Sequence, residues 1–211
     1  MTNGNNMHKS LLFLFSTTLI LLVVLSSGCT IPEERSFYVY GINIGTEGNA
    51  QNITLIVPMP YYKGEVYSEI VTDPKNSEDI GDDNTSYDIV DTKYGNMLRI
   101  QSPRNGSIKF FRDADHSPIN DTPWISGEDP VLYPRFNQTP LALDRKTGEA
   151  YDTMIYASFD GGAKSSLKIT ARLSGHTMFA SHRGYSDRVN RVTILHNESG
   201  EWIRVEGEVY S

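Results

Sequence analysis

Apolar and polar residues alternate along most of this chain, and this period of two constrains the fold more than any other feature. In residues 166–174 the apolar side chains occupy every second position, at Leu167, Ile169, Ala171 and Leu173. Such alternation is typical of strands that bury one face. The same pattern predicts strands at 37–44, 52–57, 87–92, 97–101, 107–112, 153–159, 191–196 and 201–209. No segment after residue 29 predicts a long helix, so the fold class is all-β.

Turn signals between these segments favour antiparallel pairing. Asn105-Gly106 is a strong two-residue turn, since both residues tolerate positive φ, and it predicts a hairpin joining 97–101 to 107–112. Residues 93–96, 160–163 and 196–200 are typical of slightly longer hairpin loops. Nine short strands at close spacing predict a mostly antiparallel β-sandwich, with a β-barrel as the alternative.

Residues 113–150 interrupt the alternation. Half of the ten prolines lie here, among the aromatic residues Trp124, Tyr133 and Phe136. Because proline lacks the N–H that a central strand needs, this Pro-rich segment is predicted to cross between two halves of one sandwich. Long loops are uncommon without a purpose, so the segment is also a candidate recognition surface.

The first 28 residues predict a signal peptide or a membrane-anchor helix. Lys9 precedes an apolar run over 11–25, which ends in small residues just before Cys29. Residues 25–29 resemble the lipobox of prokaryotic lipoproteins, although Ser26 occupies the position where that motif has a large aliphatic residue. The resemblance implies lipidation of Cys29. An uncleaved span is the alternative, since crossing a bilayer takes about 20 residues. Either interpretation places 29–211 outside the cytoplasm as one domain.

Glycan acceptor triplets provide a second indication of export. Asn-x-Ser/Thr occurs six times after Cys29, about three times the chance expectation. Asn120 and Asn137 are the poorer candidates, because proline follows the threonine of each triplet. The predicted glycosylation sites are Asn52, Asn84, Asn105 and Asn197.

Several longer segments are similar to secreted and lipoprotein-type proteins of methanogens and related archaea. The segments are 57–60, 91–100, 183–187 and 200–202. The similarity implies an archaeal cell-surface protein and carries no activity with it.

The composition argues against several classes of function. The chain has a net charge of −7, and removal of residues 1–28 deletes one lysine and no acid, giving −8. An acidic surface disfavours nucleic acid as a partner. The chain has no nucleophile elbow, zinc-protease motif, Cys-x-x-Cys or phosphate-binding glycine loop, so no catalytic residue and no cofactor are predicted.

Candidate metal ligands are scattered rather than grouped in a recognised motif. The histidines after the leader are His116, His176, His182 and His196, at spacings that predict no zinc site. Asp113-x-Asp115 begins like a calcium loop, but Pro118 and Trp124 stand where the turn glycine and the closing acid belong. Asp79, Asp82, Asp83 and Asn84 are better interpreted as a solvated acidic loop. No metal site is predicted.

Together these patterns indicate a membrane-tethered module of the cell envelope with a binding or structural role. The Pro-rich aromatic segment and the tyrosines would contact a glycan or an envelope protein. An extracytoplasmic hydrolase with scattered catalytic groups is the alternative. Trp202 is expected on the opposite face of its strand from Val205 and Val209.

Overall fold

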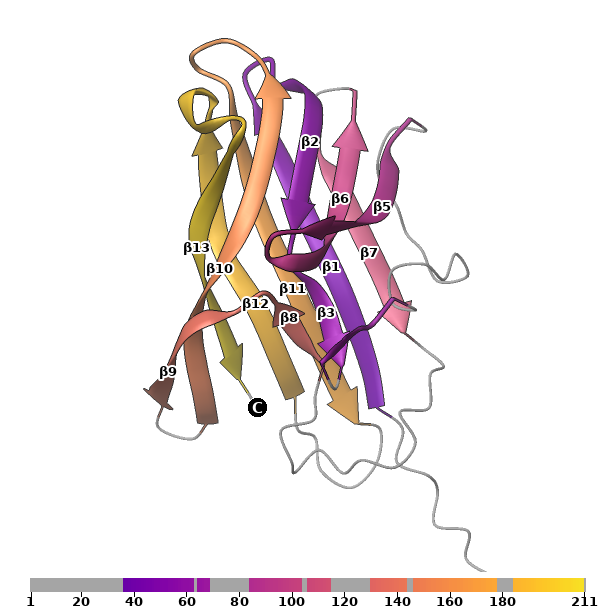
Figure 1. Ribbon diagram of the computed structural model, residues 1–211, viewed down its shortest axis with the longest axis vertical. Coiled ribbons are helices and arrows are strands. Elements are labelled where there is room, and N and C mark those ends of the chain that lie inside the picture. The colour runs from indigo at the N-terminus through magenta and orange to yellow at the C-terminus, as the bar shows by residue number, and fades with distance from the viewer. Residues whose placement is uncertain are drawn as a thin grey trace, which may run out of the picture. The chain divides into compact units, whose positions relative to one another are not determined.

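A computed structural model describes residues 36–62, 64–68, 84–103, 106–114, 130–143, 146–177 and 184–210. The fold is all-β, as the alternation predicts (Figure 1). In β11 (Ser166–Thr177), Leu167, Ile169 and Leu173 are fully buried, whereas Lys168 and Arg172 are exposed. Period-two alternation therefore separates the inner and outer faces of the strand.

All nine predicted strand segments form strands, and four further strands join them. Within the described residues the one helical turn is η2 (His196–Glu198). The other strands are β1 (Ser36–Glu47), β2 (Gln51–Val57), β3 (Met59–Tyr62), β4 (Glu65–Val66), β5 (Ser86–Thr92), β6 (Gly95–Ser102), β7 (Ile108–Ala114), β8 (Val131–Tyr133), β9 (Phe136–Leu143), β10 (Lys146–Asp160), β12 (Gly184–Leu195) and β13 (Glu201–Tyr210).

Ten strands form one antiparallel sheet, in the order β5-β6-β2-β10-β13-β12-β11-β1-β7, with β9 also paired to β10. The sheet curls strongly into a half-barrel, so that its two end strands approach each other (Figure 1). Tyr87 of β5 and Phe110 of β7 meet with ring centroids 4.9 Å apart. This architecture differs from the expected sandwich of two sheets, because alternation specifies which face is buried and not which strands pair.

A second, three-stranded sheet packs against the half-barrel. It has the order β4-β3-β8, and β3 pairs with β8 through Met59 and Tyr133. Met59 and Leu132 belong to the hydrophobic core and are fully hidden from solvent. We call residues 130–136, which include β8, the strap. The strap lies within the segment predicted to cross between the halves of the fold.

Two β-bulges allow β10 to carry two partners along one edge. Asn52 of β2 and Asn137 of β9 both adopt φ of 51°. The amide Nδ2 of each donates a 2.7 Å hydrogen bond to an aspartate of β10, Asp160 and Asp152 respectively. The register shifts beside both aspartates. Asparagine tolerates the left-handed conformation that such bulges require, and bulges increase the twist of a sheet.

The predicted hairpins are correct in part. Residues 93–96 join β5 to β6, and 196–200 join β12 to β13, and both pairs are neighbours in the sheet. The Asn105-Gly106 prediction is wrong, because β6 pairs with β2 and β5 whereas β7 pairs with β1 at the far end of the sheet. Residues 160–163 likewise connect β10 and β11, which do not pair. Curling brings strands from distant positions in the sheet close enough for such connections.

The Pro-rich segment was expected to contain no central strand, but its last residues, 148–150, belong to β10 and pair with both β9 and β13. Among the described residues β9 pairs only with β10, and Pro140 lies within β9. A strand with one partner can accommodate a residue that has no N–H.

The described residues belong to one compact unit, Glu34–Ser211. The predicted signal or anchor helix lies outside the described residues. Among the residues that are described, no helix has both the length and the hydropathy needed to cross a membrane.

Candidate functional site

A charged residue lies inside the half-barrel, at a place where alternation should put an apolar one. Tyr185, Asp187 and Val189 point inward from β12, and Asp187 is 0% exposed. Burying a carboxylate is unfavourable unless it is paired and hydrogen-bonded. The surroundings of Asp187 are therefore the first candidate for a functional site.

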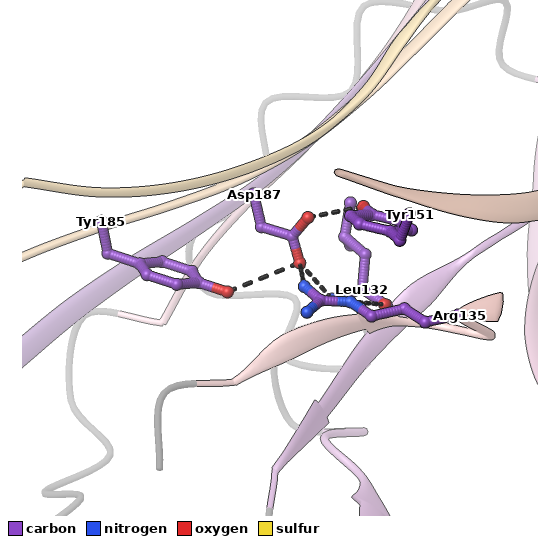
Figure 2. Close-up of polar contacts among 5 residues, drawn as sticks. All are labelled: Leu132, Arg135, Tyr151, Tyr185 and Asp187. Carbon is purple, nitrogen blue, oxygen red and sulfur yellow. Dashed lines mark hydrogen bonds and ion pairs between the residues drawn. The ribbon is translucent and has the colours of Figure 1, made fainter. Parts of the chain in front are cut away.

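Donors from three elements surround the Asp187 carboxylate (Figure 2). Oδ1 accepts a 2.5 Å hydrogen bond from the Tyr151 hydroxyl. Oδ2 accepts from the Leu132 amide at 2.6 Å and from the Tyr185 hydroxyl at 3.4 Å, and it forms an ion pair with Arg135. Both carboxylate oxygens are thus engaged by protein donors.

Arg135 makes two contacts besides its ion pair with Asp187. Its Nε donates to the Leu132 carbonyl at 2.9 Å, and its guanidinium stacks 4.4 Å from the centroid of the Tyr151 ring. The Arg135 side chain is only 8% exposed. The planar guanidinium thus serves an ion pair, a hydrogen bond and a cation–π contact at once.

Burial and charge act in opposite directions on this pair. Burial raises the pKa of Asp187, and the charge of Arg135 with the Tyr151 and Leu132 bonds offsets part of the rise. Burial lowers the pKa of Arg135, but the charge of Asp187, the Tyr151 and Tyr185 hydroxyls and the hydrogen bond to Asp187 together outweigh it, and the net direction is upward. The hydrogen bonds favour the ionised pair, since a proton on either carboxylate oxygen would face a donor.

Two buried tyrosines predict a loss of stability in alkali. Burial raises the pKa of Tyr40 and of Tyr151 well above 10.0. In the unfolded chain both hydroxyls ionise near pH 10, so above that pH the folded state binds more protons than the unfolded state. We expect the free energy of unfolding to fall by up to about 1.4 kcal/mol per pH unit for each tyrosine. Urea unfolding between pH 9 and 11 measures this, and Tyr40→Phe should reduce the slope.

The Asp187 cluster does not have the properties of a catalytic centre. A general acid or base needs an open position from which it can reach substrate. Asp187 is fully buried, and each of its oxygens already accepts a protein hydrogen bond. The cluster is therefore best interpreted as structural.

The second candidate site is a group of aromatic side chains, which we call the aromatic cluster. Four of its rings lie together: Tyr94 is 4.9 Å from Trp202 and 6.0 Å from Phe136, and Tyr156 is 5.6 Å from Trp202, all between ring centroids. All four are half-buried. They come from the β5–β6 turn, β9, β10 and β13, so elements far apart in sequence build one surface.

Tyr61 and Tyr133 extend the aromatic cluster beside the same turn. Their ring centroids are 4.7 Å apart, and Tyr133 is 38% exposed. Gly95 lies against both rings with φ of +101°, and a Cβ there would come within 3.2 Å of Tyr133 and 3.3 Å of Tyr61. The Tyr61 hydroxyl accepts a 3.0 Å bond from the Asn96 amide. A glycine in the turn therefore allows the hairpin tip to settle on these rings.

Polar groups border the aromatic cluster. Lys93 Nζ lies 4.9 Å from the centroid of the Tyr94 ring. Asp152 faces Phe136 in the β9–β10 register, accepts from Asn137, and lies 3.7 Å from Arg204 Nη1. Half-buried rings with a polar border are typical of recognition surfaces.

The structure places three of the predicted glycosylation sites on the surface. Asn52 at the start of β2, Asn84 just before β5 and Asn197 in η2 are all exposed. Asn105 and Cys29 lie outside the described residues, as does Asn120. Asn137, the other poorer candidate, is exposed on β9.

The candidate metal ligands do not form a site within the described part of the chain. No group of three or more His, Cys, Asp or Glu side chains there could hold a metal ion. His196 is half-buried, and its ring meets Phe159 edge-on at 5.9 Å. The side chains of His116, His176, His182, Asp113 and Asp115 lie outside the described residues, as do Asp79, Asp82 and Asp83.

Sequence reasoning missed Asp187 and Arg135. The available signal was the alternation of β12, which places an acid between two inward apolar residues, Tyr185 and Val189. An acid at such a position requires a buried partner, but nothing in the sequence indicates that the partner is Arg135, 52 residues earlier. Trp202 lies outward, as predicted, while Val205 is buried.

Comparison with known proteins does not extend this description. No protein-family model, no curated protein sequence and no solved structure matches the chain.

Proposed function

We propose that this chain is a cell-envelope lipoprotein that acts as a binding module on the outer face of the membrane, with the aromatic cluster as its contact surface. The aromatic cluster carries the proposal. Its six rings come from six elements and gather at one place, beside polar side chains that can hydrogen-bond a ligand.

The proposed cellular location rests on the amino-acid sequence. An apolar leader with a single lysine ends at Cys29, the only cysteine, and six glycan acceptor triplets follow. The exposed positions of Asn52, Asn84 and Asn197 are compatible with glycosylation. An archaeal source and a lipid anchor at Cys29 are part of the same proposal.

The chemistry of the aromatic cluster favours a neutral glycan as the ligand. Flat rings with polar tips can stack against the C–H faces of a pyranose. The Asp152 carboxylate, the Asn137 amide and Arg204 lie next to Phe136 and can exchange hydrogen bonds with sugar hydroxyls. Opposite charges are mixed along this border, which suits an uncharged ligand better than a polyanion.

The alternatives receive less support. A hydrolase would need ionisable groups that converge on an accessible substrate, and the cluster of ionisable groups around Asp187 is closed to solvent. An assembly factor would offer an unprotected strand edge. The end strands of the sheet instead carry exposed charges, with Asp88 and Asp91 on β5 and Lys109 on β7.

Intact mass of the membrane-extracted protein tests the anchor. We expect loss of residues 1–28 and a lipid-sized addition, both absent from a Cys29→Ser variant. Hexose-type increments in the same spectrum would count the occupied asparagines. The mass of the full unmodified chain would contradict lipidation and leave the uncleaved span.

Calorimetric titration tests the ligand. Full-length protein in detergent would be titrated with cellohexaose, maltohexaose and chitohexaose. We expect saturable binding of at least one hexasaccharide, weakened about tenfold by Trp202→Ala, since loss of a stacked ring removes about 1.4 kcal/mol. Phe111→Ala is the matched control, because Phe111 is exposed on β7 outside the aromatic cluster. No binding of any of the three sugars would contradict the glycan assignment.

A further inference from the structure

The Asp187–Arg135 ion pair forms hydrogen bonds with the backbone of one strap residue, Leu132. The Leu132 amide donates to Asp187 Oδ2 at 2.6 Å, and the Leu132 carbonyl accepts from Arg135 Nε at 2.9 Å. Both polar backbone groups of Leu132 are therefore bonded to the two members of one buried ion pair (Figure 2).

Two rings of the aromatic cluster belong to the residues that directly follow Leu132 and Arg135. Tyr133 follows Leu132, and Phe136 follows Arg135. The Tyr133 ring meets Tyr61, and the Phe136 ring meets Tyr94. Any shift of Leu132 or Arg135 relative to β12 must therefore move these two rings relative to the four carried by other elements.

We infer that Asp187 and Arg135 are positioning residues of the aromatic cluster, and that their ion pair fixes the strap so that Tyr133 and Phe136 complete the binding surface. The inference rests on the proposed function for its meaning. The directional hydrogen bonds of Asp187 and Arg135 fix one position of the strap, whereas apolar packing of Leu132 alone would allow the strap to slide. The network acts in a dry interior, where such bonds are strong.

Tyr151 connects this hydrogen-bond network to β10. It stacks under the Arg135 guanidinium, and its hydroxyl binds Asp187 Oδ1. β10 also carries Tyr156 of the aromatic cluster. The same network therefore ties the strap to a strand on which another part of the binding surface is built.

Hydrogen–deuterium exchange of the full-length protein tests the inference. The variants are Asp187→Asn, which keeps the side-chain volume, and Arg135→Lys, which keeps the charge but loses the planar fork. We expect peptides covering 130–136 to exchange about tenfold faster or more, with little change in β1 and β11. In a Trp124→Phe background, where Trp202 is the only tryptophan, its emission should shift because Phe136 no longer holds Tyr94.

Two controls separate positioning from general loss of stability. Leu98→Ala removes a fully buried side chain of β6 and should accelerate exchange throughout the sheet rather than in the strap alone. Arg188→Lys changes the exposed pair with Glu208 on the same strand as Asp187 and should leave the strap unchanged. If Asp187→Asn does not fold, Arg135→Lys carries the test.

Unchanged strap exchange and unchanged Trp202 emission in both variants would overturn the inference, as would acceleration spread evenly over β1, β11 and the strap. These readouts need no ligand, so they separate the two proposals. A wild-type protein that binds no hexasaccharide, with the strap results as expected, would remove the glycan assignment and leave the positioning role. If sugars do bind, both variants should weaken binding about tenfold, and Arg188→Lys should not.

Discussion

Replacing Arg135 by methionine is expected to lower the free energy of unfolding by about 3–5 kcal/mol, which is the typical cost of leaving a buried charge without its partner. Asp187 is fully hidden from solvent, and methionine offers it neither charge nor hydrogen bond. For a domain of this size the loss corresponds to a fall in melting temperature of roughly 6–20 °C. Urea unfolding followed by far-ultraviolet circular dichroism measures it.

A double variant checks the cause of this loss. Arg135→Met combined with Asp187→Leu removes both charges, and it should be more stable than Arg135→Met alone, because apolar replacement of a whole buried pair is often neutral or stabilising. Arg188→Met is the exposed control and should cost less than about 1 kcal/mol. A loss of under 1 kcal/mol for Arg135→Met would mean that the pair contributes little to the fold.

Substitution of Gly207 by alanine is expected to cost about 3 kcal/mol, through overlap with Tyr151. A Cβ at Gly207 would overlap Cζ of Tyr151 and lie 2.6 Å from the Tyr151 hydroxyl oxygen. The ring cannot move aside easily, because Asp187 holds its hydroxyl and Arg135 covers its face. Overpacking a core typically costs about 1–3 kcal/mol, and a fixed neighbour favours the upper end.

Chemical denaturation of Gly207→Ala beside Gly45→Ala gives the comparison. Gly45 lies in β1, and its nearest neighbour would be 3.8 Å from a new Cβ, so alanine there should be tolerated. Combining Gly207→Ala with Tyr151→Ala should cost less than the sum of the single losses, because the overlap is then removed. Strict additivity would show that Tyr151 is not the obstacle.

The strands could be predicted from the sequence because each depends on a local pattern. The alternation in β11 identifies its buried residues without reference to other strands, and the same holds for β1 and β13. The hairpin tip at Gly95 was also predictable, since positive φ at a turn favours glycine. Local rules suffice wherever one segment carries the whole signal.

The pairing of strands could not be predicted, because it depends on partners far away along the chain. Asn105-Gly106 has the chemistry of a hairpin turn, yet β7 pairs with β1 rather than with β6. The short strands β3, β4 and β8 were missed because each is too brief to show a period. The bulges at Asn52 and Asn137 increase the local twist of the sheet, and the sequence shows them only as polar residues.

The candidate site was predicted in outline only. The Pro-rich segment, a candidate recognition surface on the sequence, contributes Tyr133 and Phe136 to the aromatic cluster. Their neighbours Tyr94 and Trp202 come from a turn and a strand whose proximity follows from the tertiary fold. The ion pair that holds the strap combines residues of opposite charge 52 positions apart, and no local pattern joins them.

The ladder between β1 and β11 has a consequence for how the molecule reaches its native state. It joins Ser36–Glu47 to Ser166–Thr177 along their entire length. During synthesis β1 therefore waits for its main partner until the strands from β2 to β10 have also left the ribosome. Contacts of such high sequence separation slow folding and leave strand edges open in the meantime. Nascent chains of this protein should consequently depend on chaperones until β11 has been synthesised.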